Sequence, residues 1–194
     1  KWMAHDDLLQ PTWLERCVAA LDASGPEVCV AYTAVSPLRE EEGSLLPYDG
    51  EFPWGASTPD GRLTQMLLMD GVSILTKCYP VFGVMRREAL AGTRLIQPFN
   101  ASDKVLLAEM ALRGDFVQVP EYLFHRRLHS KNSRRANTTP QQILKWFDPE
   151  ATRPATAHKD LWDGYRRAVR EADLSNGQAR DCRRIVRRWA WRLR

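Results

Sequence analysis

The sequence predicts an α/β protein in which a sheet is flanked by helices, and three observations support this fold class. Apolar residues from Trp13 to Leu21 recur at helical spacing, and the almost wholly apolar run Val28–Tyr32 follows them. A short run of this kind is typical of a strand that is covered on both faces. Further along, the helical pattern Ser102–Arg113 again precedes strand-like sequence. Helices that alternate with buried strands indicate an α/β fold.

The first part of the chain supplies the elements in order. Pro11 suits the first turn of the first helix, and the Ser-Gly-Pro breaker at 24–26 ends that helix. The strand at Val28–Tyr32 comes next. The segment 36–62 is rich in proline, glycine and acidic residues, which predicts a long loop. Residues 63–69 then predict a short helix.

The second part repeats this alternation. The run YPVFGVMRREAL predicts a strand that meets Gly83 and continues into a helical turn. The helix Ser102–Arg113 is expected to stop at Gly114. The segments FVQVP and YLFHRRLH are strand-like, and beyond SKNSRRANTTPQQ the chain becomes helical and charged.

The composition is that of an ordinary globular protein. The chain has 194 residues, of which 44% are hydrophobic and 27% charged, and this length suffices for one domain with a real core. Its four cysteines lack the paired spacing of a zinc site or a disulfide framework. This pattern favours reduced thiols and a cytoplasmic protein.

Two adjacent carboxylates, Asp6 and Asp7, are the first candidate functional residues. Neighbouring side chains of an extended chain point to opposite faces. One aspartate could therefore face a cation while the other reaches a different group, such as a sugar hydroxyl. Strand ends in open α/β sheets border the ligand crevice. A polar strand-to-helix turn, with Asp favouring the helix amino terminus, explains the same doublet, and both interpretations stay open.

Asp103 is the second candidate, because it falls in the first turn of the helix Ser102–Arg113. A carboxylate in this place is favoured by the helix dipole. It is either an ionised group held ready as a general base or a helpful charge beside a cap at Asn100 or Ser102.

The segment FHRRLH contains the third group of candidates. If it is a strand, His125 and His129 share a face but lie about 13 Å apart, at roughly 3.3 Å per residue. At most one of them can then bind a given metal ion. Arg127 shares this face, and a cation there suits a phosphate. An edge strand that carries solvated charges is the alternative.

Taken in order, these segments resemble glycosyltransferase family 2, which has the GT-A fold. WMAHDDLLQPTWLERCVAALD is similar to the family's DxD-type segment and the helix after it, and PVFGVMRREAL is similar to its acceptor-side glycine loop. NASDKVLLAEMALRGDFVQVPEYLFHRRLH is similar to its x-E-D segment, closing strand and terminal His. The resemblance covers residues 1–133 and implies a GT-A mixed sheet, with residues 134–194 as a basic helical extension. It also implies that the chain, which begins with Lys1, is about the carboxyl-terminal two thirds of the catalytic domain, without the amino-terminal nucleotide-binding part.

The resemblance implies an inverting, metal-dependent enzyme. Such an enzyme moves a sugar from a nucleotide-diphosphate sugar to a hydroxyl of a carbohydrate or lipid-linked acceptor. Asp7 and His129 would hold a divalent cation, Mn²⁺ or Mg²⁺, at the diphosphate. Asp6 and Arg127 would contact the nucleotide-sugar donor.

On the acceptor side, Asp103 would deprotonate the hydroxyl, and Gly83 would let the acceptor approach the backbone closely. Two positions depart from the family pattern. His5 stands where many relatives have the first Asp of DxD, and Ser102 replaces the Glu of x-E-D. These departures support an alternative function, a non-catalytic, membrane-associated binding domain of the same fold.

The carboxyl end is strongly basic, since residues 151–194 hold 12 Lys and Arg but only 5 Asp and Glu. In RDCRRIVRRWAWRLR, Ile185 and Trp189 would align on one face of a helix. Basic amphipathic helices with Trp are typical of membrane surfaces. Residues 180–194 are therefore expected to meet an anionic membrane, on its inner face, unless the helix packs on its own domain instead. Nucleic acid is not an expected partner, because no recognition module accompanies the tail.

Overall fold

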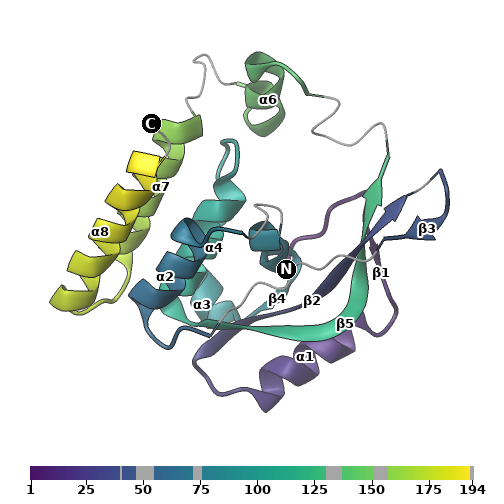
Figure 1. Ribbon diagram of the computed structural model, residues 1–194, viewed down its shortest axis with the longest axis horizontal. Coiled ribbons are helices and arrows are strands. Elements are labelled where there is room, and N and C mark those ends of the chain that lie inside the picture. Colours follow the sequence, from purple (N-terminus) through teal and green to yellow (C-terminus); the bar gives the residue numbers. More distant parts are fainter. Residues whose placement is uncertain (40, 47–54, 72–75, 130–136, 151–156, 193–194) are drawn as a thin grey trace.

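The protein is a mixed α/β structure, in agreement with the predicted class. The structure is a computed structural model, and Figure 1 shows that helices flank both faces of its sheet. The predicted boundary at residues 133 and 134 lies outside the described residues, as does part of the predicted loop. The residues that the structure describes are 1–39, 41–46, 55–71, 76–129, 137–150 and 157–192.

The sheet is built on two long parallel strands, β2 (Val28–Arg39) and β5 (Asp115–Leu128). On the far side of β5, the short strand β1 (Leu8–Leu9) pairs in the antiparallel direction. On the far side of β2, β4 (Val84–Met85) and β3 (Ser44–Leu45) pair antiparallel with its first and last parts. The sheet is therefore mixed.

The register between β2 and β5 shifts at a bulge. Thr33 faces Val119, whereas the next residue of β2, Ala34, faces Tyr122. Pro120 lies in this bulge. A proline has no N–H to donate, and at a bulge no hydrogen bond between the strands is lost for that reason. The bulge explains why the sequence of β5 reads as two strand-like segments, although it forms one strand.

Helix α1 (Trp13–Ala23) covers one face of the sheet (Figure 1). It begins at Trp13 rather than at Pro11, which lies in the preceding turn. Its apolar stripe packs on side chains of β2 and β5. The buried residues of this core are Trp13, Cys17, Leu21, Ala31, Val35, Tyr79 and Phe124.

The other face is covered by α4 (Ser102–Arg113), which has the predicted bounds, and by helices that pack around it (Figure 1). All residues from Val105 to Leu112 are buried. The helices around it are α2 (Pro59–Leu68), α7 (Ala157–Glu171) and α8 (Asn176–Arg192).

The two carboxyl-terminal helices belong to this core. Tyr165 of α7 and Cys182 and Val186 of α8 are buried with the residues of α4. Trp189 stacks on His158 and meets Tyr165 edge-on. The face of α8 that the sequence predicts as apolar is thus directed into the domain. Among the described helices, none is both long enough and apolar enough to span a bilayer.

Three local predictions are wrong. Strand β2 does not end at Tyr32 but continues to Arg39, because its second half, although it contains Ser36 and Pro37, pairs with β5, a partner that local sequence does not reveal. The helix predicted at 63–69 begins at Pro59, where Thr58 accepts a hydrogen bond from the Gly61 backbone N–H.

The third error concerns the run YPVF, which forms a 3₁₀ helix (Thr76–Phe82) instead of a strand. The N–H of Gly83 donates to the carbonyl of Pro80, at 2.9 Å, which closes the last turn. The strand β4 therefore starts only after Gly83. The predicted helical turn follows as α3 (Arg87–Ala91), and α6 (Pro140–Phe147) begins with a capping box.

Candidate functional site

The acidic pair Asp6 and Asp7 lies against the end of β5. It lies directly before β1, with His5 and Asp6 in a turn, and not after a strand as the sequence suggested. The antiparallel pairing of Leu8 with His125 places the residues before Leu8 beside those that follow His125. Two segments more than 100 residues apart in the chain therefore form one site.

Asp6 contacts His129. The His129 Nε2 atom lies 3.0 Å from Asp6 Oδ2, and the two side chains are only 17% and 21% exposed. Burial acts to raise the pKa of Asp6, but the hydrogen bond with His129 and other local interactions outweigh it, so the pKa is lowered. His5 is almost fully exposed and lies 4.0 Å from the other oxygen of Asp6.

Asp7 has a different partner. Its Oδ1 accepts a hydrogen bond of 3.0 Å from the backbone N–H of Arg127. Burial is the main cause that raises the pKa of Asp7, and the charge of Asp6 adds to it, although the Arg127 hydrogen bond acts in the opposite direction. The two neighbouring carboxylates thus titrate in opposite directions from their ordinary values, because their surroundings differ.

His125, within β5, and His129, just after it, lie in different surroundings. His129 lies at the acidic pair, whereas His125 is 7% exposed and its Nε2 lies 2.7 Å from the amide nitrogen of Gln10. The His125 Nδ1 is buried and has no hydrogen-bond partner among the described residues. Sequence reasoning missed Gln10, since nothing in its local sequence indicates a partner on β5.

Asp103 lies in the first turn of α4, as predicted, but the expected side-chain cap is absent from the described structure. The cap position is Ala101, which has φ 64° in the left-handed region. The hydroxyl of Ser102 donates instead to the carbonyl of Gln97, at 2.7 Å. The carboxylate of Asp103 accepts a 3.0 Å hydrogen bond from the backbone N–H of Lys104.

The surroundings of Asp103 perturb its titration. Burial is the main cause that raises its pKa, while hydrogen bonds, among them one with Cys78, act to lower it. The buried Tyr165 of α7 also interacts electrostatically with Asp103. Cys78 and Tyr165 are neighbours that sequence reasoning did not identify, because they come from a 3₁₀ segment and from a helix taken to be an extension.

Asp103 is not joined to the acidic pair by a direct interaction. Within the described residues, its carboxylate makes no hydrogen bond or ion pair with Asp6, Asp7 or His129. The structure therefore brings together the proposed donor-side residues and leaves Asp103 in separate surroundings.

Gly83 packs closely against β2. A Cβ atom at this position would lie 2.6 Å from the carbonyl oxygen of Ala31 and 3.1 Å from the Cβ of Tyr32. These distances are too short for a side chain. The need for glycine at this position therefore follows from packing within the domain, whether or not an acceptor binds nearby.

The donor atoms at the acidic pair suit a hard divalent cation. In the described part of the chain, no three His, Cys, Asp or Glu side chains are grouped as a complete metal site. Mg²⁺ sites commonly use one or two carboxylates and take further ligands from water and substrate phosphates. Asp7, with His129 beside it, offers a partial set of this kind. Comparison of the sequence with protein-family models and with curated proteins finds no match.

Proposed function

We propose that the protein is a metal-dependent, inverting glycosyltransferase of the GT-A type. It would transfer a sugar from a nucleotide-diphosphate sugar to a hydroxyl of a carbohydrate or lipid-linked acceptor. The observation that carries this proposal is the 3.0 Å contact between Asp6 and His129, with Asp7 held by the backbone of Arg127 beside it. The resemblance assigns the donor to these residues, and the mixed sheet flanked by helices is compatible with the proposed fold.

The electrostatics at the acidic pair support a cation. Burial raises the pKa of Asp7, and repulsion by the adjacent carboxylate of Asp6 adds to this. A divalent ion would relieve this cost by stabilising the ionised form. When bound, the ion would neutralise the charge that develops on the leaving diphosphate. Asp7 and His129 would hold the ion, and Asp6 and Arg127 would orient the donor.

Asp103 suits the role of the general base. A base works best when its pKa lies close to the working pH, and burial shifts the pKa of Asp103 upward, in that direction. Its carboxylate also forms no ion pair with the other described residues. We propose that Asp103 accepts the proton of the acceptor hydroxyl as the new glycosidic bond forms.

A donor screen tests this proposal. The full-length protein is incubated with uridine, guanosine and thymidine diphosphate sugars, with Mn²⁺ or with chelator, and the release of nucleoside diphosphate is measured. We expect cation-dependent release that is lost in Asp7→Asn and kept in Asp22→Asn, a matched change at an exposed residue of α1.

The outcomes separate the hypotheses. Release that continues in chelator, or in Asp7→Asn at the full rate, contradicts the proposed role of Asp7. Donor binding without release from any donor contradicts the enzyme and supports the alternative, a non-catalytic binding domain.

A further inference from the structure

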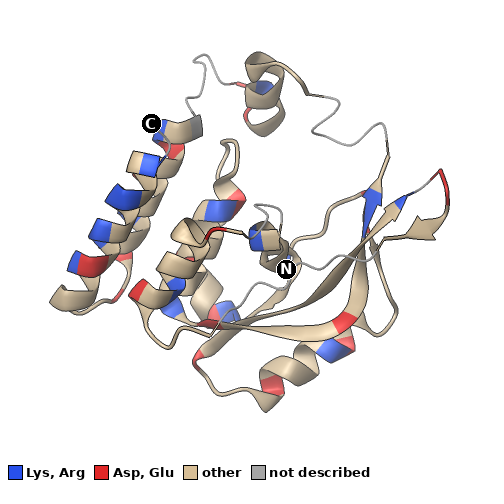
Figure 2. Ribbon diagram, viewed as in Figure 1, with Lys and Arg blue, Asp and Glu red and all other residues tan. Residues whose placement is uncertain are grey.

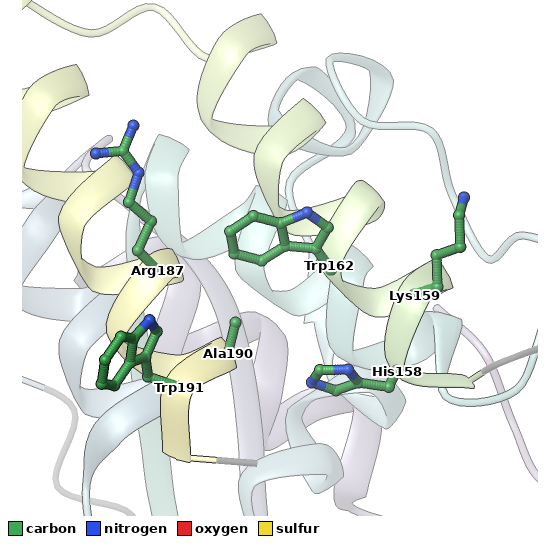
Figure 3. Close-up of a pocket in the computed structure, with 6 residues that line it drawn as sticks. All are labelled: His158, Lys159, Trp162, Arg187, Ala190 and Trp191. Atoms are coloured by element: carbon green, nitrogen blue, oxygen red, sulfur yellow. The ribbon is translucent and has the colours of Figure 1, made fainter. Parts of the chain in front are cut away.

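Two neighbouring hollows lie between α7 and α8. The larger, of about 490 Å³, is lined by His158, Lys159, Trp162, Arg187, Ala190 and Trp191 (Figure 3). The smaller, of about 190 Å³, is lined by Trp162, Arg166, Val169, Arg170, Arg183, Val186 and Arg187. Because both include Trp162 and Arg187, they form one continuous surface, which we call the α7–α8 groove.

The groove is cationic, and its lining residues include no carboxylate. Arg166, Arg183 and Arg187 make no ion pair within the described part of the chain. Other arginines of α8 are paired, since Arg184 lies 3.0 Å from Asp181 and Arg192 lies 3.0 Å from Asp70. Figure 2 shows the concentration of basic residues on α8. Two other cations of the groove are also paired, since Lys159 lies 2.8 Å from Asp163 and Arg170 lies 3.6 Å from Glu171. The positive charge that the described residues leave unpaired in the groove is therefore that of Arg166, Arg183 and Arg187.

Tryptophan accompanies this charge. Trp191 is 76% exposed, the largest exposure of any large hydrophobic side chain described. Trp162 lies across the groove from it (Figure 3), with the guanidinium of Arg166 5.5 Å from its ring centre. Tryptophan favours the boundary between water and lipid, where its ring is apolar and its N–H remains hydrated.

We infer that the α7–α8 groove binds the surface of an anionic bilayer, with Arg183 and Arg187 at lipid phosphates and Trp191 at the acyl boundary. This differs from an amphipathic helix at 180–194 lying flat on the membrane, because Cys182 and Val186 of that helix are buried in the core. The contact surface instead needs both helices in their folded arrangement. The inference does not depend on sugar transfer.

Vesicle flotation tests the arginines. The full-length protein is mixed with vesicles of phosphatidylcholine alone or with added phosphatidylglycerol. The double variant Arg183→Gln and Arg187→Gln should weaken binding to the anionic vesicles about thirtyfold, because each arginine near such a surface contributes about a fivefold factor. Arg180→Gln with Arg184→Gln removes the same charge from the same helix but outside the groove, beside Asp181. This control should weaken binding much less.

The tryptophan gives a second, independent readout. Trp191→Ala should weaken vesicle binding, whereas Trp146→Ala, on α6 and 55% exposed, should not. Brominated lipid should quench the fluorescence that Trp191 contributes, so quenching should be stronger in the native protein than in Trp191→Ala. Thermal unfolding should be unchanged in all of these variants, because each replaces an exposed side chain.

Two results overturn the inference. Equal loss of vesicle binding in the groove variant and in its control shows only a diffuse attraction by net charge. Binding of a single-stranded oligonucleotide that needs Arg183 and Arg187 but not Trp191, without binding to anionic vesicles, identifies a nucleic-acid surface instead.

Discussion

At the scale of single residues, Asp6 and Asp7 show how surroundings distinguish two identical neighbours. Asp6 points to the ring of His129, and Asp7 points to the backbone N–H of Arg127. Burial alone would raise the pKa of Asp6, but the contact with His129 helps to lower it. The pKa of Asp7 stays raised, because the hydrogen bond from Arg127 does not compensate for burial and for the charge of Asp6. The pair thus divides into one carboxylate, Asp6, that a side-chain hydrogen bond already stabilises, and another, Asp7, that a cation would stabilise.

Asp6 is expected to stabilise the fold in a pH-dependent way. Because its folded pKa is lowered, its contribution is present above the unfolded pKa and is lost as pH falls through the folded pKa. Asp6→Asn should therefore lower the free energy of unfolding by about 1 kcal/mol at pH 7, and the difference should vanish in acid. Urea denaturation across pH measures this, with Asp22→Asn as the control. A deficit that persists unchanged in strong acid is incompatible with the Asp6–His129 contact as its cause.

Asp103 is expected to show the opposite pattern. Its folded pKa is raised by burial, so its ionisation at pH above that value acts against folding. Asp103→Asn should leave the protein at least as stable at neutral pH while kcat falls about 10²- to 10⁴-fold, the usual effect of losing a general base. Paired measurements of turnover and thermal unfolding decide this. A variant that turns over normally but loses about 1 kcal/mol of stability would assign Asp103 to the helix dipole alone.

Gly83 is expected to be essential for packing. Gly83→Ala places a methyl group 2.6 Å from the carbonyl oxygen of Ala31, and overpacking of this kind costs about 1–3 kcal/mol. Gly177→Ala is the matched change, because the added methyl group would lie 4.0 Å from the hydroxyl oxygen of Ser175, an ordinary contact distance. Denaturant unfolding should show a clear loss of stability for Gly83→Ala, and for Gly177→Ala a much smaller change or one of opposite sign. Equal stability of the two variants would show that the backbone around Gly83 can move to accommodate the methyl group.

At the scale of elements, α8 is a structural helix with a basic outer face. Val186 is 1% exposed and belongs to the same core as α4. Val186→Ala should therefore destabilise the whole domain by about 2 kcal/mol through the lost contacts and the cavity. Val18→Ala, on the exposed side of α1 and 39% exposed, provides the same change without the cavity.

Deletion of residues 180–194 should accordingly impair folding and not simply release the protein from a membrane. A cooperative unfolding transition that is unaffected by Val186→Ala would contradict this view and show that α8 does not belong to the core of the domain.

Local patterns predicted the elements whose buried face is visible as a periodicity in their own sequence. Helices α1 and α4 follow from apolar periodicity, and the position of Asp103 in the first turn of α4 follows with them. The length of β2 could not be predicted, because its second half owes its structure to pairing with β5. The 3₁₀ segment before Gly83 was also missed, because the apolar run YPVF is equally compatible with a strand.

The candidate site divides in the same way. No local signal places Asp6 beside His129, since the contact depends on the pairing of β1 with β5 across most of the chain. The family resemblance assigned both residues to the donor side but did not predict that they would contact each other. The contact of Cys78 with Asp103 had no sequence signal at all.

At the scale of the whole molecule, the fold separates two candidate surfaces. The acidic pair lies at the end of β5 beside β1, whereas the α7–α8 groove lies on helices that pack on α4 and α2 (Figure 1). The first carries carboxylates and suits a cation with a diphosphate. The second carries unpaired arginines and suits an anionic lipid surface. A protein built in this way could hold a soluble donor while it stays close to a lipid-linked acceptor.

The central claim, that Asp7 and His129 hold a divalent cation with the donor diphosphate, is tested most directly by NMR of the four histidine rings. Mn²⁺ is added together with a nucleoside diphosphate, and paramagnetic broadening is recorded for each ring. We predict that the His129 resonances broaden first, that those of His158 on α7 remain sharp, and that Asp7→Asn abolishes the effect while Asp22→Asn preserves it. Broadening that spares His129, or that is the same in Asp7→Asn, would contradict the proposed site.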